Sequence, residues 1–150
     1  MKSAILALSV LVLAACDTDA VGRDLTTLRV GDLSHDADAL VGTWRLSTLT
    51  GPGDCGPPCQ QTVPASVRGV SETLTFRAGG TFEQVRTYQG GEWEDAGTYE
   101  VRRIDYGNGT QSKDPVLFLN DSPESFGLDG DRLYLDDRPV DGELLEYVRR

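Results

Sequence analysis

The chain has 150 residues, which is enough for one domain with or without a tail. It carries 24 acidic residues against 14 Lys and Arg, a formal net charge of −10, so long-range repulsion of phosphates argues against nucleic acid as a partner. A hydrophobic fraction of 39% can build a core, and a single histidine, His35, excludes a multi-histidine metal centre and leaves little room for a histidine-dependent triad.

The first 15 residues have the pattern of an export signal. Lys2 precedes an apolar run over residues 4–15, which only Ser9 interrupts and which is too short for a permanent membrane span. The run ends in Leu13-Ala14-Ala15-Cys16, which resembles the lipobox of bacterial lipoproteins. The resemblance implies cleavage before Cys16 and several acyl chains on it, enough for stable anchoring to a membrane. An ordinary secretory signal with an incidental cysteine is the alternative.

Residues 16–39 separate this leader from the rest of the chain. They are polar and acidic, and they predict a lipidated Cys16 followed by a flexible tether. The alternative is a short helix that starts at Asp38, with Ser34 or Asp36 as its cap, and packs against the folded domain. Residues 40–150 are expected to form that domain.

Two further cysteines, Cys55 and Cys59, lie in a loop rich in glycine and proline. Export would place them in an oxidising compartment, where a disulfide is expected. Gly56 and the pair Pro57-Pro58 can turn the chain tightly enough to bring the sulfur atoms together. The alternatives are a redox pair, which usually has two intervening residues, and half of a metal site, which would need two more ligands.

Short strands separated by turn signals fill the remainder of the chain. In residues 70–76 the side chains of Val70, Leu74 and Phe76 share one face, and Ala78-Gly79-Gly80 then turns the chain into a strand over 81–88. Further strands are expected over residues 42–49, 92–103, 116–119, 125–128, 132–135 and 143–149. About eight strands joined by short turns predict an all-β fold, an antiparallel up-and-down barrel, with a β-sandwich as the alternative.

The segment Leu40-Val41-Gly42-Thr43-Trp44 resembles the opening of bacterial lipocalin-like domains, whose first strand carries Gly-X-Trp. Residues 74–76, 80–82, 97–101, 131–133 and 146–149 fit the same resemblance in order. The resemblance implies a lipocalin-like barrel plugged at one end by Trp44. A late basic residue, Arg149 or Arg150, would cover the Trp44 ring, and such stacking stabilises by about 0.5 to 2 kcal/mol.

A barrel of this kind either holds a cavity or is filled by side chains. If there is a cavity, an apolar set with two phenols is expected to line it: Leu46, Phe76, Phe82, Tyr99, Phe118, Leu133 and Tyr147. Such a lining suits a small hydrophobic ligand. The alternative is that these residues form only the core.

The sequence shows no Gly-X-Ser-X-Gly elbow, phosphate loop or nucleotide fingerprint, so we expect no catalytic residues, no cofactor and no metal. The predicted function is that of a monomeric, non-enzymatic lipoprotein of the bacterial cell envelope that binds a small hydrophobic ligand. Its lipid would hold it at a membrane, on the periplasmic face or the cell surface. The alternative is a protein-interaction or inhibitor module that uses the rigid loop 55–59, because a preorganised loop loses less entropy on docking.

Overall fold

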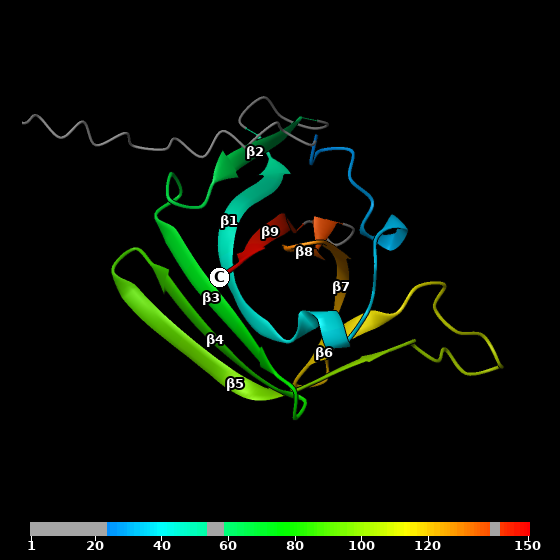
Figure 1. The fold of residues 1–150 in the computed structure, drawn as a ribbon. Helices are drawn as coiled ribbons and strands as arrows, with labels where there is room; N and C mark the ends of the chain where they lie inside the picture. The colour runs from blue at the N-terminus through cyan, green and yellow to red at the C-terminus, as the bar shows by residue number, and fades with distance from the viewer. Residues whose placement is uncertain (1–23, 54–58, 139–141) are drawn as a thin grey trace, which may run out of the picture.

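The computed structural model describes residues 24–53, 59–138 and 142–150. In these residues one antiparallel sheet winds into a ring (Figure 1). Its strands are β1 (Gly42–Pro52), β2 (Gln60–Pro64), β3 (Val70–Arg77), β4 (Thr81–Tyr88), β5 (Gly91–Arg102), β6 (Val116–Leu119), β7 (Ser122–Asp129), β8 (Arg132–Asp136) and β9 (Leu144–Arg149).

The ring closes because β9 pairs with β1 as well as with β8. This pairing confirms the predicted antiparallel barrel of eight strands, β1 and β3 to β9, and excludes the sandwich alternative. β2 is additional: it pairs only with β1, where Thr48–Pro52 lie opposite Gln60–Pro64. The sequence analysis missed β2 because its residues are mostly polar and exposed and lack the alternation of a half-buried strand.

β1 is longer than predicted because it pairs with three strands, β2, β3 and β9. Its first residues, from Gly42 to Arg45, pair with β3, and its last five pair with β2. On the other edge β1 pairs with β9, with a register shift between Leu46 and Thr48. Such a bulge bends a strand and changes which side chains face inward. Leu46 and Leu49 are therefore both buried in the core, although they are three residues apart.

Residues 24–39 correct the predicted tether, because they pack on the barrel instead of standing away from it. Leu25 and Val30 form a cluster with Tyr134 and Leu144, whose side chains lie on the outer face of β8 and β9. The guanidinium of Arg138 ties this segment down, since its Nη1 donates to the carbonyl oxygen of Leu25 at 2.9 Å. This packing was not predicted because the segment is mostly polar and acidic, and its few leucines and valines show no helical or strand period.

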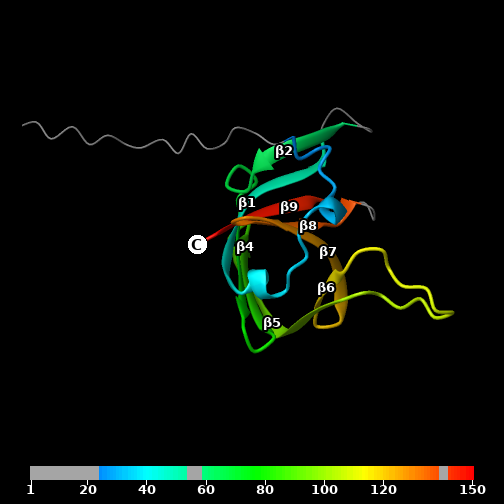
Figure 2. The ribbon, with the colours of Figure 1, turned by 45° about the vertical axis from the view of Figure 1, so that its right-hand side comes forward.

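Two short 3₁₀ helices lie in this segment, η1 (Val30–Asp32) and η2 (Asp38–Leu40). η2 corresponds to the alternative short helix of the sequence analysis. Its N-cap position is Ala37, which supplies no side-chain cap, while Asp36 Oδ1 accepts from the amide of Asp38 at 3.0 Å. η2 ends in Leu40, which is fully buried, so the segment covers one end of the barrel (Figure 2).

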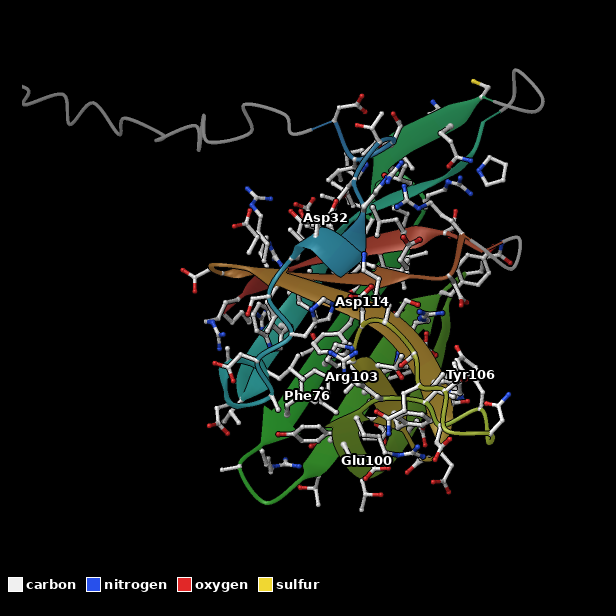
Figure 3. The ribbon with its side chains drawn as sticks, turned by 90° about the vertical axis from the view of Figure 1, so that its right-hand side faces the viewer. Asp32, Phe76, Glu100, Arg103, Tyr106 and Asp114 are labelled. Atoms are coloured by element: carbon white, nitrogen blue, oxygen red, sulfur yellow. The ribbon has the colours of Figure 1, made fainter. Side chains whose placement is uncertain are left out.

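A loop between β5 and β6 projects from the side of the barrel and carries the exposed Tyr106 (Figures 2 and 3). Arg103 holds its base, because Nη1 donates to the carbonyl oxygen of Ser112 at 2.9 Å and to that of Lys113. Phe76, by contrast, lies inside the ring of strands (Figure 3). The barrel interior and this projecting loop are therefore separate surfaces.

Candidate functional site

One end of the barrel is closed by Trp44, which is fully buried at the start of β1. Its indole Nε1 donates to the carbonyl oxygen of Leu40 at 2.7 Å. The guanidinium of Arg149 lies 4.0 Å from the centroid of the Trp44 ring, and its Nη1 and Nη2 donate to the carbonyl oxygens of Val41 and Ala39 at 2.8 and 2.7 Å. One residue therefore both stacks on the plug and fastens η2 to it.

Gly42 lets this closure form. Its φ is +141°, a conformation that favours glycine, and a Cβ at this position would lie 2.5 Å from Nη1 of Arg149. Any side chain here would strain the backbone and push the guanidinium away from Trp44. The glycine of the Gly-X-Trp motif thus makes room for the arginine.

Nearer the other end, the interior contains a buried carboxylate. Glu72 is 1% exposed, and its Oε1 accepts from Gln84 Nε2 at 2.6 Å and from the Tyr147 hydroxyl at 2.7 Å. Its Oε2 accepts from Arg86 Nε at 2.5 Å, so an ion pair and two further hydrogen bonds compensate the buried charge. β3, β4 and β9 each supply part of this cluster.

The cluster perturbs the titration of its members. Burial, followed by the negative charge of Glu72, raises the pKa of Tyr147 well above its ordinary value. Burial alone would lower the pKa of Arg86, but the charge and hydrogen bond of Glu72 outweigh it and raise that pKa. Both side chains therefore keep their protons across the neutral range.

A cavity of about 530 Å³ opens at this end of the barrel. Its walls combine an apolar part with charged groups from the strands and from the loops at the rim. The lining residues are Leu46, Leu49, Arg68, Val70, Arg86, Tyr88, Asp137, Gly142, Glu143 and Leu145. Another hollow of similar volume lies outside the barrel, beside residues 24–33, and is far more open to solvent.

The wall formed by β7 and the end of β8 is acidic. Glu124 lies on the same side of β7 as Phe126 and Leu128, which belong to the core, so its carboxyl group also faces the interior. Burial, and then the charge of Asp137, raises the pKa of Glu124 to about 7. A carboxyl group that titrates near neutrality therefore lies next to Asp137, which lines the cavity.

A family model described as a lipocalin-like domain matches residues 40–122, more than half of the chain. The chain belongs to the lipocalin-like domain family. Comparisons with curated proteins and with solved structures give no match. The matched range starts at the buried Leu40 of η2 and includes the Gly-X-Trp segment, and the lipocalin-like barrel continues through β8 and β9 to the C-terminus.

In this lipocalin-like barrel the residues expected to line a cavity have three different positions. Leu46 lines the cavity. Phe76, Phe82, Leu133 and Tyr147 are buried in the core, and Tyr99 packs against it with its ring centroid 4.9 Å from that of Phe76. Most of the expected lining thus belongs to the core of the barrel and does not line the cavity.

Phe118 is a correction. Leu117 is the residue of β6 that belongs to the core, so Phe118, one residue on, points to the outer face. The guanidinium of Arg102 covers its ring, 3.7 Å from the centroid. The run Val116–Leu119 is apolar throughout, and without alternation its sequence carried no signal of which face is inward.

The polar residues of the interior were missed, although a signal existed. Val70, Leu74 and Phe76 were assigned to one face of β3, and Glu72 has the same parity. Gln84 and Arg86 lie opposite Leu74 and Glu72 in the β3–β4 register, which puts them on the same inner face. Strict alternation would have indicated them, but burial of a glutamate was not expected without knowledge of its partners.

The leader and part of the cysteine loop lie outside the described residues. These include Cys16 and Cys55, so lipidation and the Cys55–Cys59 disulfide stay predictions. At the base of the loop the amide of Gly53 donates to the carbonyl oxygen of Cys59 at 3.0 Å. Within the described ranges, no helix is long and apolar enough to cross a membrane, and no group of three or more His, Cys, Asp or Glu is placed to hold a metal ion.

Proposed function

We propose that this protein is a lipoprotein of the bacterial cell envelope whose lipocalin-like barrel binds a small ligand with a hydrophobic part and catalyses no reaction. The observation that carries the proposal is the cavity of about 530 Å³ at one end of a barrel plugged at the other. Its volume falls within the roughly 300 to 1,000 Å³ typical of small-molecule sites.

The lining of the cavity supports binding of a hydrophobic body. Leu46, Leu49, Val70 and Leu145 supply an apolar surface on neighbouring strands. Burial of ligand carbon against them stabilises by about 25 cal/mol per Å² removed from water. The buried Glu72 is held by three donors and does not line the cavity, an arrangement that favours a structural role over abstraction of a substrate proton.

Native mass spectrometry of the protein purified from its own membranes tests ligand binding. We expect an adduct of a few hundred daltons that is released on unfolding. The matched variant is Leu49→Arg, which places a charged side chain in the cavity, and it should lose the adduct while keeping the β-sheet circular dichroism. Recovery of no adduct from the wild-type protein would overturn the binding proposal.

Membrane anchoring rests on the leader and on Cys16. Replacement of this residue, Cys16→Ser, is expected to move the protein from the membrane fraction to the soluble fraction, because the thiol that accepts the acyl chains is lost. Cys59→Ser is the control and should leave the distribution unchanged. Equal membrane association of Cys16→Ser and wild type would contradict the lipoprotein assignment.

An interaction module that uses the loop 55–59 is the second candidate. The observation that favours it is the position of β2, which follows this loop, pairs only with β1 and has mostly exposed side chains. In a pull-down from envelope extract, the double variant Cys55→Ser, Cys59→Ser should then recover less partner than the wild type. Equal recovery would count against the loop.

A further inference from the structure

The cavity carries opposite charges on opposite walls. Arg86 comes from β4, and Asp137 directly follows β8, which stands across the ring from β4 in the strand order (Figure 1). Between them, on β1 and β9, lie the apolar side chains of Leu46, Leu49 and Leu145. A basic group, an apolar floor and an acidic group therefore line one cavity.

Arg86 is held in place and keeps donors to spare. Its Nε is committed to Glu72, and the Tyr147 hydroxyl lies close enough to the guanidinium to influence it. Arginine has five N–H donors, so most of them are left for another acceptor. The side chain is 40% exposed and lines the cavity, although Glu72 behind it is fully buried. The guanidinium thus presents a preorganised site for an anionic group.

Asp137 offers the complementary charge. Among the described residues, its carboxylate has no hydrogen bond or ion pair, and Glu124, whose pKa its charge helps to raise, is itself acidic. The remaining charges on the cavity walls are Arg68 and Glu143, which pair with each other at 3.5 Å between Nη2 and Oε1. Asp137 is consequently the acidic group of the wall that lacks a counter-charge there.

We propose that the cavity takes a small zwitterionic ligand whose two charged groups stand at opposite ends of an apolar body, of the kind represented by an ω-amino acid. Its anionic group lies at the guanidinium of Arg86, its cationic group at the carboxylate of Asp137, and its apolar body on Leu46, Leu49 and Leu145. This assignment rests on the proposed function, since it names the class of ligand that the same cavity binds.

Three probes with the same six-carbon chain separate the contributions: 6-aminohexanoate carries both charges, one at each end, hexanoate carries only the anion, and hexylamine carries only the cation. Isothermal titration calorimetry on the full-length protein in a non-ionic detergent measures each Kd. We expect 6-aminohexanoate to bind at least about tenfold more tightly than either singly charged probe, equivalent to about 1.4 kcal/mol.

Two variants assign the charges to residues. Asp137→Asn should weaken the binding of 6-aminohexanoate about tenfold and leave that of hexanoate unchanged, because only the cationic group loses its partner. The double variant Glu72→Gln, Arg86→Gln avoids a buried unpaired charge and should weaken both ligands that carry a carboxylate. Asp121→Asn, at the exposed turn between β6 and β7, is the matched control and should leave the Kd of both carboxylate-bearing ligands unchanged.

The outcomes distinguish this inference from the binding proposal. If hexanoate or hexylamine binds as tightly as 6-aminohexanoate, or if Asp137→Asn weakens all three probes alike, the zwitterion assignment is wrong while the cavity still binds ligands. If none of the probes binds but a hydrophobic adduct is recovered from membranes, the assignment is likewise overturned and the binding function stands. Failure of both experiments overturns both proposals.

Discussion

Removal of a single hydroxyl group, by Tyr147→Phe, tests whether the buried cluster holds the barrel together. The ring of Tyr147 is fully buried, so phenylalanine preserves the packing and deletes only the hydrogen bond to Glu72 Oε1, which is 2.7 Å long. A hydrogen bond to a charged group contributes about 1.5 to 3 kcal/mol. Because Gln84 still donates to the same oxygen, we expect the lower part of this range, about 1.5 to 2 kcal/mol.

For a chain of this size such a loss lowers Tm by roughly 3 to 8 °C. Thermal unfolding followed by circular dichroism at pH 7 measures it, and the control is Tyr88→Phe, whose hydroxyl is exposed at the rim. Tyr147 has its pKa raised in the folded state, so the stability that its protonated hydroxyl contributes is present at neutral pH and is lost as the pH rises above about 10. The Tm difference between wild type and Tyr147→Phe should therefore shrink in alkali. A Tm within 1 °C of wild type at pH 7 would refute the reasoning.

Three further predictions concern the plug and the acidic wall. Arg149→Ala should lower the free energy of unfolding by about 2 to 4 kcal/mol, from the lost stacking on the plug tryptophan and two hydrogen bonds to carbonyls, whereas Arg150→Ala should change urea unfolding little. Gly42→Ala should lower the free energy of unfolding by at least about 1 kcal/mol, because Gly42 has a positive φ and the guanidinium of Arg149 lies close to it. Gly79 lies in open space, so Gly79→Ala should stay within about 0.5 kcal/mol of wild type. Glu124 has a folded pKa of about 7, above its unfolded value, so the free energy of unfolding of the wild type should fall as the pH rises from about 4.5 to 7. Glu124→Gln should reduce the difference between the free energies of unfolding that urea gives at pH 5 and at pH 8. An unchanged difference would contradict the raised pKa of Glu124.

Local signals predicted the strands that alternate and are bounded by glycine turns. β4 has the predicted bounds, and β3 extends only one residue further, because alternation and the Ala78-Gly79-Gly80 turn lie within a few neighbouring residues. β2 was missed because its stability comes from β1 and not from an apolar face of its own. Sequence therefore predicts a strand well when the strand buries one face, and poorly when pairing alone holds it.

The prediction of a flexible tether was wrong for residues 24–39 for a related reason. Leu25 and Val30 gain their burial from Tyr134 and Leu144, which lie more than a hundred positions later in the chain. A sequence window of a few residues contains only one half of such a contact. The same limitation concealed the outward orientation of Phe118, since the inner face of β6 is set by its register with Val101 and Tyr99 of β5.

The sequence by itself determined that the domain is antiparallel β and that Gly42 and Trp44 open a lipocalin-like first strand, while the export-type leader stays a prediction. These features depend on residue type, alternation and turn chemistry, which are local properties. Only the tertiary structure decided how the interior is divided into an apolar plugged half and a charged open half. Glu72 and Tyr147 are 75 positions apart, and Arg86 and Asp137 line one cavity only because β9 closes on β1. A carboxylate can be buried there because closure of the ring adds the Tyr147 hydroxyl to the two donors from the neighbouring strand, and together they compensate its lost hydration.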